Sequence, residues 1–167
     1  MSKEEILKYV CEIFNKHKVK YIIIGGMAVA YHGHSRLTML PNGQESDKFD
    51  IDILYQPTLT NNFNLIKSLK ELGFDIHGSG SSSFPVYSKD FDEYGLDFLP
   101  YLPGLENTEL SKKRELFSLY YNKRDISIYD GVKIPFISLD DLIEIKKFSS
   151  RPKDLEDIEE LKKKNGL

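Results

Sequence analysis

The segment from Phe49 to Tyr55 constrains the fold more than any other, because apolar and acidic residues alternate along it. The period of two predicts a β-strand and directs the side chains of Asp50 and Asp52 to the same face. Two carboxylates about 7 Å apart along a strand repel each other unless water or a cation screens their charges. The segment therefore predicts either a metal-binding strand or a strand with a solvated polar face.

A second constraint is an apolar run that stops at two glycines. Residues 20–24, Lys-Tyr-Ile-Ile-Ile, predict a central strand buried on both faces. Gly25 and Gly26 then lead into a short helix-forming segment that ends near Gly33. Glycine at a strand-to-helix turn lets the backbone approach a phosphate closely, although the same pair also suits a plain tight turn.

The remaining pattern predicts an α/β (α+β) fold, with a central mixed sheet flanked by helices and further helices at the C-terminal end. Helices are predicted after Ser2, over residues 63–72, after Ser138 and from Pro152. Strands are also predicted at 84–87 and 96–99, from residue 74, and in a hairpin of residues 125–129 and 132–136. Residues 103–123 fit a helix or a strand, and residues 35–48 and 78–83 predict surface loops.

Length and charge bound the class of protein. A chain of 167 residues predicts one domain, 1–167, with a core over about 1–100 and a C-terminal hairpin and helices over about 101–167. The net charge of −3 argues against nucleic-acid binding by bulk electrostatics. A single cysteine excludes an intrachain disulfide, and no apolar stretch is long enough for a signal peptide or a membrane span. We therefore expect a soluble, cytoplasmic protein.

A third carboxylate, Asp97, lies in a predicted strand that Pro100 ends. Its rivals Asp90, Asp92 and Glu93 lie in a polar, turn-like run, which favours Asp97 as the partner of the acidic pair. A phosphate-binding turn and paired carboxylates, each at a strand, are the parts needed to hold a magnesium–triphosphate complex.

With these residues the chain resembles the DNA polymerase β-like nucleotidyltransferase superfamily. Within it, the run of residues 25–38, Gly-Gly-Met-Ala-Val-Ala-Tyr-His-Gly-His-Ser-Arg-Leu-Thr, followed by Asp50-Ile51-Asp52, is similar to the abortive-infection toxin and related prokaryotic branch. A late lysine-bearing helix followed by residues 151–157 extends the resemblance. One departure is the stretch from Met39 to Phe49, which separates the two motifs and lengthens the loop over the site.

The resemblance implies two Mg²⁺ or Mn²⁺ ions, held by Asp50, Asp52 and Asp97 against a nucleoside triphosphate. Asp97 would lie nearest the acceptor hydroxyl and take its proton. The implied nucleotide contacts are Gly25, Gly26, Arg36, Thr38, Lys147 and Lys153. From the residues alone, Arg36 fits a solvated ion pair equally well, and the two lysines fit a charged helix face.

The leading hypothesis is an enzyme that moves a nucleoside monophosphate from a nucleoside triphosphate to a hydroxyl of RNA, including tRNA, or of a protein. The toxin-like resemblance adds a role in a toxin–antitoxin pair, with a cognate toxin or antitoxin as partner. One alternative is a small-molecule nucleotidyltransferase of the aminoglycoside-modifying type. The other is a non-catalytic nucleotide- or metal-binding module.

Overall fold

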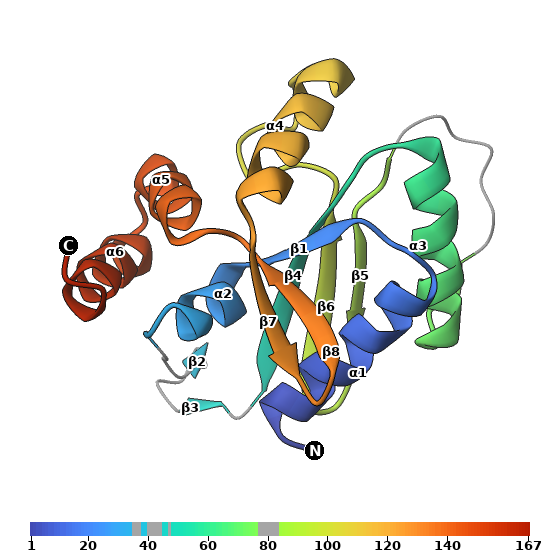
Figure 1. The fold of residues 1–167 in the computed structure, drawn as a ribbon, viewed down its shortest axis with the longest axis horizontal. Coiled ribbons are helices and arrows are strands. Elements are labelled where there is room, and N and C mark those ends of the chain that lie inside the picture. Colours follow the sequence, from blue (N-terminus) through green and yellow to red (C-terminus); the bar gives the residue numbers. More distant parts are fainter. Residues whose placement is uncertain (35–37, 40–44, 47, 77–83) are drawn as a thin grey trace.

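A computed structural model describes residues 1–34, 38–39, 45–46, 48–76 and 84–167 (Figure 1). Its main sheet has six strands in the spatial order β5 (Tyr87–Asp90), β6 (Tyr94–Leu99), β4 (Phe49–Tyr55), β1 (Tyr21–Ile24), β8 (Val132–Phe136) and β7 (Asp125–Tyr129). A separate pair consists of β2 (Thr38–Met39) and β3 (Glu45–Ser46). The main sheet contains both parallel and antiparallel pairs, which confirms the predicted mixed α/β fold.

Six helices are described around these strands. They are α1 (Lys3–Lys16), α2 (Gly25–Tyr31), α3 (Leu59–Glu71), α4 (Leu110–Lys123), α5 (Leu139–Ser149) and α6 (Pro152–Lys164). Side-chain caps explain three of the starts, because Ser2, Thr58 and Ser138 each accept a hydrogen bond from a backbone N–H in the first turn. Within the described ranges, no helix is long and apolar enough to cross a membrane.

The register of the central strands brings the predicted acidic residues together. β4 runs parallel to β6, with Asp52 beside Asp97 and Asp50 beside Gly95. On the other side of β4, β1 runs antiparallel and places Ile24 beside Asp52. The turn that follows Ile24 therefore begins next to this carboxylate.

The two faces of the sheet have different roles. Phe14 of α1 contacts Phe98 edge to face, with 5.4 Å between ring centroids, and Ile51 and Ile53 are fully buried. Because side chains alternate along a strand, the acidic residues of β4 and β6 project from the opposite face. In Figure 1, α1 and α3 lie together on one side of the sheet, away from α2, α5 and α6. The acidic face therefore points toward the C-terminal helices.

Several predicted elements differ in the structure. Residues 74–76 form no strand. The ring of Phe74 packs edge to face against Phe98, with 5.8 Å between ring centroids, and its backbone pairs with no described strand. β5 begins at Tyr87 and includes Asp90, which therefore does not lie in a turn. The ambiguous region from 103 to 123 contains α4 from Leu110 onward. The predicted loop at 78–83 lies outside the described residues, as does most of the loop at 35–48.

Candidate active site

The two carboxylates of β4 each lie against a glycine. Gly25 has a φ of +66°, and a Cβ there would overlap Oδ2 of Asp52 and lie 2.9 Å from its Cγ. A Cβ on Gly95 would lie 2.5 Å from Oδ1 of Asp50. Both carboxylates thus occupy space that any other residue would fill, whereas a Cβ on Gly26 would meet nothing within 4 Å. Sequence reasoning missed Gly95, although a glycine inside a strand signals such a close approach.

The surroundings of Asp52 strongly perturb the ionisation of its carboxyl group. Burial raises the pKa of Asp52 to about 6, and the negative charges of Asp97 and Asp50 add to the shift. The positive charges of Lys153 and Lys146 act in the opposite direction. Asp52 therefore lies within the fields of two acidic and two basic side chains.

The donor type suits a hard divalent cation, since all three candidates are carboxylates on one face of adjacent strands. In the part of the chain that the structure describes, no three His, Cys, Asp or Glu side chains are arranged as a ready-made metal site. The strand positions fit such a cation, and binding it requires the three carboxylates to converge by side-chain rotation.

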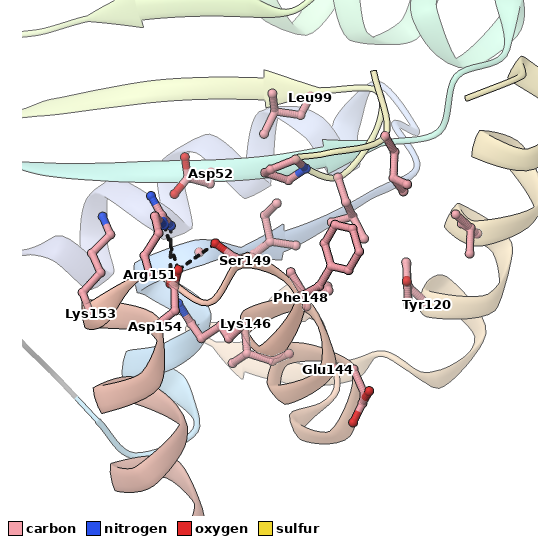
Figure 2. A pocket seen from close by; sticks show the side chains of 18 of the residues that line it. Asp52, Leu99, Tyr120, Glu144, Lys146, Phe148, Ser149, Arg151, Lys153 and Asp154 are labelled. Carbon is pink, nitrogen blue, oxygen red and sulfur yellow. Dashed lines mark hydrogen bonds and ion pairs between the residues drawn. The ribbon is translucent and has the colours of Figure 1, made fainter. Parts of the chain in front are cut away.

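A cavity of about 600 Å³ opens beside Asp52 and extends toward α4 and α5. At its polar end Figure 2 shows Asp52, Arg151 and Lys153 close together, with Tyr120 toward the other end. The charged residues that line the polar end are Asp50, Asp52, Lys146, Arg151, Lys153 and Asp154. Asp97 and Gly26 are not among the lining residues.

A buried ion network fixes the basic side of the cavity. Asp154 is 1% exposed and accepts hydrogen bonds from Lys146 Nζ at 3.1 Å, Ser149 Oγ at 2.7 Å and Arg151 Nε at 2.7 Å. Lys146 also forms an ion pair with Asp157 at 2.9 Å. Burial opposes ionisation of Asp154, but the bonds from Arg151, Ser149 and Lys146 outweigh it and hold its pKa below the usual range. The network joins the end of α5 to the start of α6.

The predicted nucleotide contacts fall into three groups. Gly25 and Lys153 line the cavity. Lys147 is exposed and pairs with Glu144 at 3.2 Å, and the neighbouring Lys146 lines the cavity instead. Arg36 lies outside the described residues, and for Thr38 the structure describes the backbone strand β2 alone.

Sequence reasoning did not select Lys146, Ser149 or Arg151 as site residues. The signal for Arg151 was its place in the run Arg-Pro-Lys-Asp, where Pro152 starts a helix and sets the arginine at its N-cap position. The signal for Lys146 was weaker, because two adjacent lysines on a helix give no indication of which one turns inward.

Comparison with known proteins places this site in a family. A family model described as a nucleotidyltransferase of unknown function (DUF6036) matches residues 4–164, and none of the curated proteins compared matches the chain. The crystal structure of the lincosamide antibiotic adenylyltransferase LnuA with lincomycin bound shares 20% identity over 97% of each chain, with a TM-score of 0.58. An antigenic nucleotidyltransferase-like protein from Paracoccidioides brasiliensis shares 16% identity over 96% of this chain and 77% of its own, with a TM-score of 0.57.

Both solved structures share the fold of this chain, and the family model spans almost all of it. The predicted membership in the nucleotidyltransferase superfamily, and with it the prediction of an enzyme of this type, is therefore confirmed. The chain belongs to the DUF6036 family of nucleotidyltransferases.

Proposed function

We propose that this protein transfers a nucleoside monophosphate from a nucleoside triphosphate to a hydroxyl group, with Asp50, Asp52 and Asp97 holding two Mg²⁺ or Mn²⁺ ions. The proposal rests on the register of β4 and β6. This register sets Asp97 beside Asp52, on the face of the sheet that also holds Asp50. The family match supports the same reaction class.

In the proposed reaction the acceptor hydroxyl oxygen attacks the α-phosphorus and forms a new P–O bond. The bond between the α-phosphorus and the bridging oxygen breaks, and pyrophosphate leaves with the electron pair. In this proposal Asp97 takes the hydroxyl proton, and its register position beside Asp52 supports that role. The bound divalent ions would neutralise the phosphate charge that builds up during this transfer.

The basic residues of the cavity supply the contacts to the triphosphate. Arg151 and Lys153 line the polar end together with Asp52, and a guanidinium or ammonium group there pairs with phosphate oxygens. Gly25 and Gly26 remain predicted phosphate contacts through their backbone, and Arg36 and Thr38 remain predictions from the resemblance. Because Lys153 lines the cavity and Lys147 does not, we assign the lysine role to Lys153.

Two classes of acceptor are proposed. A hydroxyl of RNA, including tRNA, or of a protein would suit a toxin–antitoxin role with a cognate partner protein in the cytoplasm. A small-molecule acceptor is favoured by the cavity of about 600 Å³, a size typical of small-ligand sites. The structural likeness to a lincosamide adenylyltransferase agrees with the second class.

The direct test is transfer of label from each α-labelled nucleoside triphosphate, with Mg²⁺, into total RNA, total protein and a small-molecule pool. We expect label with the wild type and none with the Asp50→Ala, Asp52→Ala double variant. If the wild type binds no nucleoside triphosphate in a magnesium titration and labels no pool, the transferase proposal fails. If the wild type binds a nucleoside triphosphate but transfers label into none of the three pools, the non-catalytic module is favoured.

The role of Asp97 has its own matched test. Asp97→Asn is expected to lower transfer by about 100-fold or more, because the variant side chain neither accepts the proton nor carries the charge that a cation needs. Asp92→Asn, at the acidic residue outside the strands, is expected to stay within about twofold of the wild type. Equal losses in both variants would contradict the assignment.

A further inference from the structure

The proposed transfer chemistry uses one end of the cavity and leaves the other end without a role. Beyond Asp52 the walls are apolar and come from the segment after β6, from α4 and from α5. Besides Ile24, Pro103 and Leu142, the apolar lining residues are Leu99, Leu102, Leu105, Leu116, Ile145 and Phe148. We call these six residues the apolar end.

The apolar end is partly closed by an aromatic rim. Phe148 lines the cavity and is 74% exposed, so its ring lies at the mouth of the cavity. Its ring lies over Gly104, where an added Cβ would come within 2.9 Å of it. The side chain therefore reaches from α5 to the segment that follows β6, and Figure 2 shows it between the Asp52 end and Tyr120.

The chemistry of the apolar end excludes two occupants. A polyanion such as RNA would meet apolar walls, and Glu144 on the lining would repel it. A nucleobase read by its edge needs several hydrogen-bonding groups, whereas among the described residues near this end the polar side chains are those of Glu144 and Tyr120. A molecule that removes an apolar surface from water gains most from these walls.

We propose that the apolar end binds the apolar body of a small, neutral, amphiphilic acceptor, whose hydroxyl group lies near Asp52 at the polar end. This inference rests on the proposed nucleotidyl transfer and names the acceptor class of the same site. The volume of the whole cavity, about 600 Å³, accommodates a ligand of this size.

The test compares two probes that carry the same sugar hydroxyls, octyl glucoside below its micelle concentration and methyl glucoside. In the presence of Mg²⁺ and ATP, we expect the wild type to bind octyl glucoside at least about tenfold more tightly, because the longer chain leaves water. Leu116→Glu, which places a charge on the wall, is expected to remove this preference.

The matched control is Leu119→Glu on the same helix. Leu119 is 50% exposed and does not line the cavity, so this variant is expected to keep the preference. If Leu116→Glu fails to fold by circular dichroism, Ile145→Glu on the facing wall of α5 replaces it.

Binding of Mg²⁺ and ATP, measured on the same proteins, separates the outcomes. Loss of the octyl preference in Leu116→Glu with unchanged ATP affinity supports the inference. Equal binding of the two glucosides by a wild type that binds ATP overturns it and leaves the proposed function intact. If Leu116→Glu weakens ATP binding by the same factor, the apolar end holds the base and the inference is overturned. A wild type that binds none of the four nucleoside triphosphates removes the proposed function, and this inference with it.

Discussion

At the scale of single residues, the site depends on the absence of two side chains. The carboxylates of Asp52 and Asp50 lie where a Cβ on Gly25 or Gly95 would be. Gly25 also has a positive φ, which other residues adopt at a cost in free energy. Its role at this turn is therefore both steric and conformational.

Gly25→Ala is expected to displace Asp52, since the new Cβ would overlap its Oδ2. We expect at least about a tenfold loss in affinity for a magnesium–nucleoside triphosphate complex, together with about 1–3 kcal/mol of lost stability. Isothermal titration and urea unfolding measure the two effects. Gly26→Ala, which meets nothing within 4 Å and needs no positive φ, is the control for stability and should leave the free energy of unfolding nearly unchanged. Equal effects of the two variants on stability would show that the steric argument is wrong.

At the scale of elements, the C-terminal helices are joined by charge as well as by apolar packing. Lys146 of α5 is 6% exposed and pairs with Asp154 and Asp157 of α6, which are 1% and 0% exposed. Such a network is stabilising only while every charge in it keeps a partner. It also presents Arg151 and Lys153 to the polar end of the cavity.

Lys146→Met is expected to destabilise the protein by about 3–5 kcal/mol, because it removes the lysine that neutralises two buried carboxylates. Lys147→Met is the matched control, since the exposed Lys147 pairs only with Glu144 among the ion pairs found, and it should cost less than about 0.5 kcal/mol. Urea unfolding of both variants at neutral pH checks the contrast. Similar stabilities for the two variants would contradict the role of the network.

The same network predicts a pH dependence. Although burial opposes its ionisation, hydrogen bonds from Arg151, Ser149 and Lys146 lower the pKa of Asp154 in the folded protein. A carboxyl with a lowered pKa stabilises the fold above its unfolded pKa of about 4, and this contribution is lost as the pH falls toward the lowered value. Asp154→Asn should therefore cost about 2–4 kcal/mol at pH 7 and clearly less near about pH 3. Urea unfolding at both pH values tests this, and a pH-independent difference from the wild type would refute it.

At the scale of the whole molecule, the C-terminal helices share one core with the sheet. Leu142 of α5 and Ile158 and Leu161 of α6 belong to the same buried apolar cluster as Ile22 and Ile53 of the central strands. A continuous core of this kind is what a single domain requires, and the single domain stays a prediction.

We accordingly expect the sheet and the C-terminal helices to unfold together. In native-state hydrogen exchange, the slowest amides of β1 and of α5 should open with free energies within about 1 kcal/mol of each other. If the free energy of opening of α5 and α6 is about 2 kcal/mol or more below that of β1, the two helices form a separate cooperative unit. Peptide-resolved mass spectrometry makes the measurement.

Much of the fold was predictable because local patterns and the fold agree. The alternation in residues 49–55, the apolar run before Gly25 and the Asp130-Gly131 turn each give elements that the structure confirms. The error at residues 74–76 arose because Phe74 is buried by packing against Phe98 and not in a strand. The local sequence pattern does not distinguish these two kinds of burial.

The local sequence pattern by itself determined which residues share a face of a strand, because successive side chains alternate between the two faces. Asp50 and Asp52 were therefore a pair before any fold was known. Only the tertiary structure decided that Asp97 lies beside Asp52, that Gly95 lies under Asp50, and that Lys146 turns inward where Lys147 does not. Strand register joins residues about 45 positions apart, and the packing of α5 on α6 joins Lys146 to partners in another helix. No local propensity specifies such contacts.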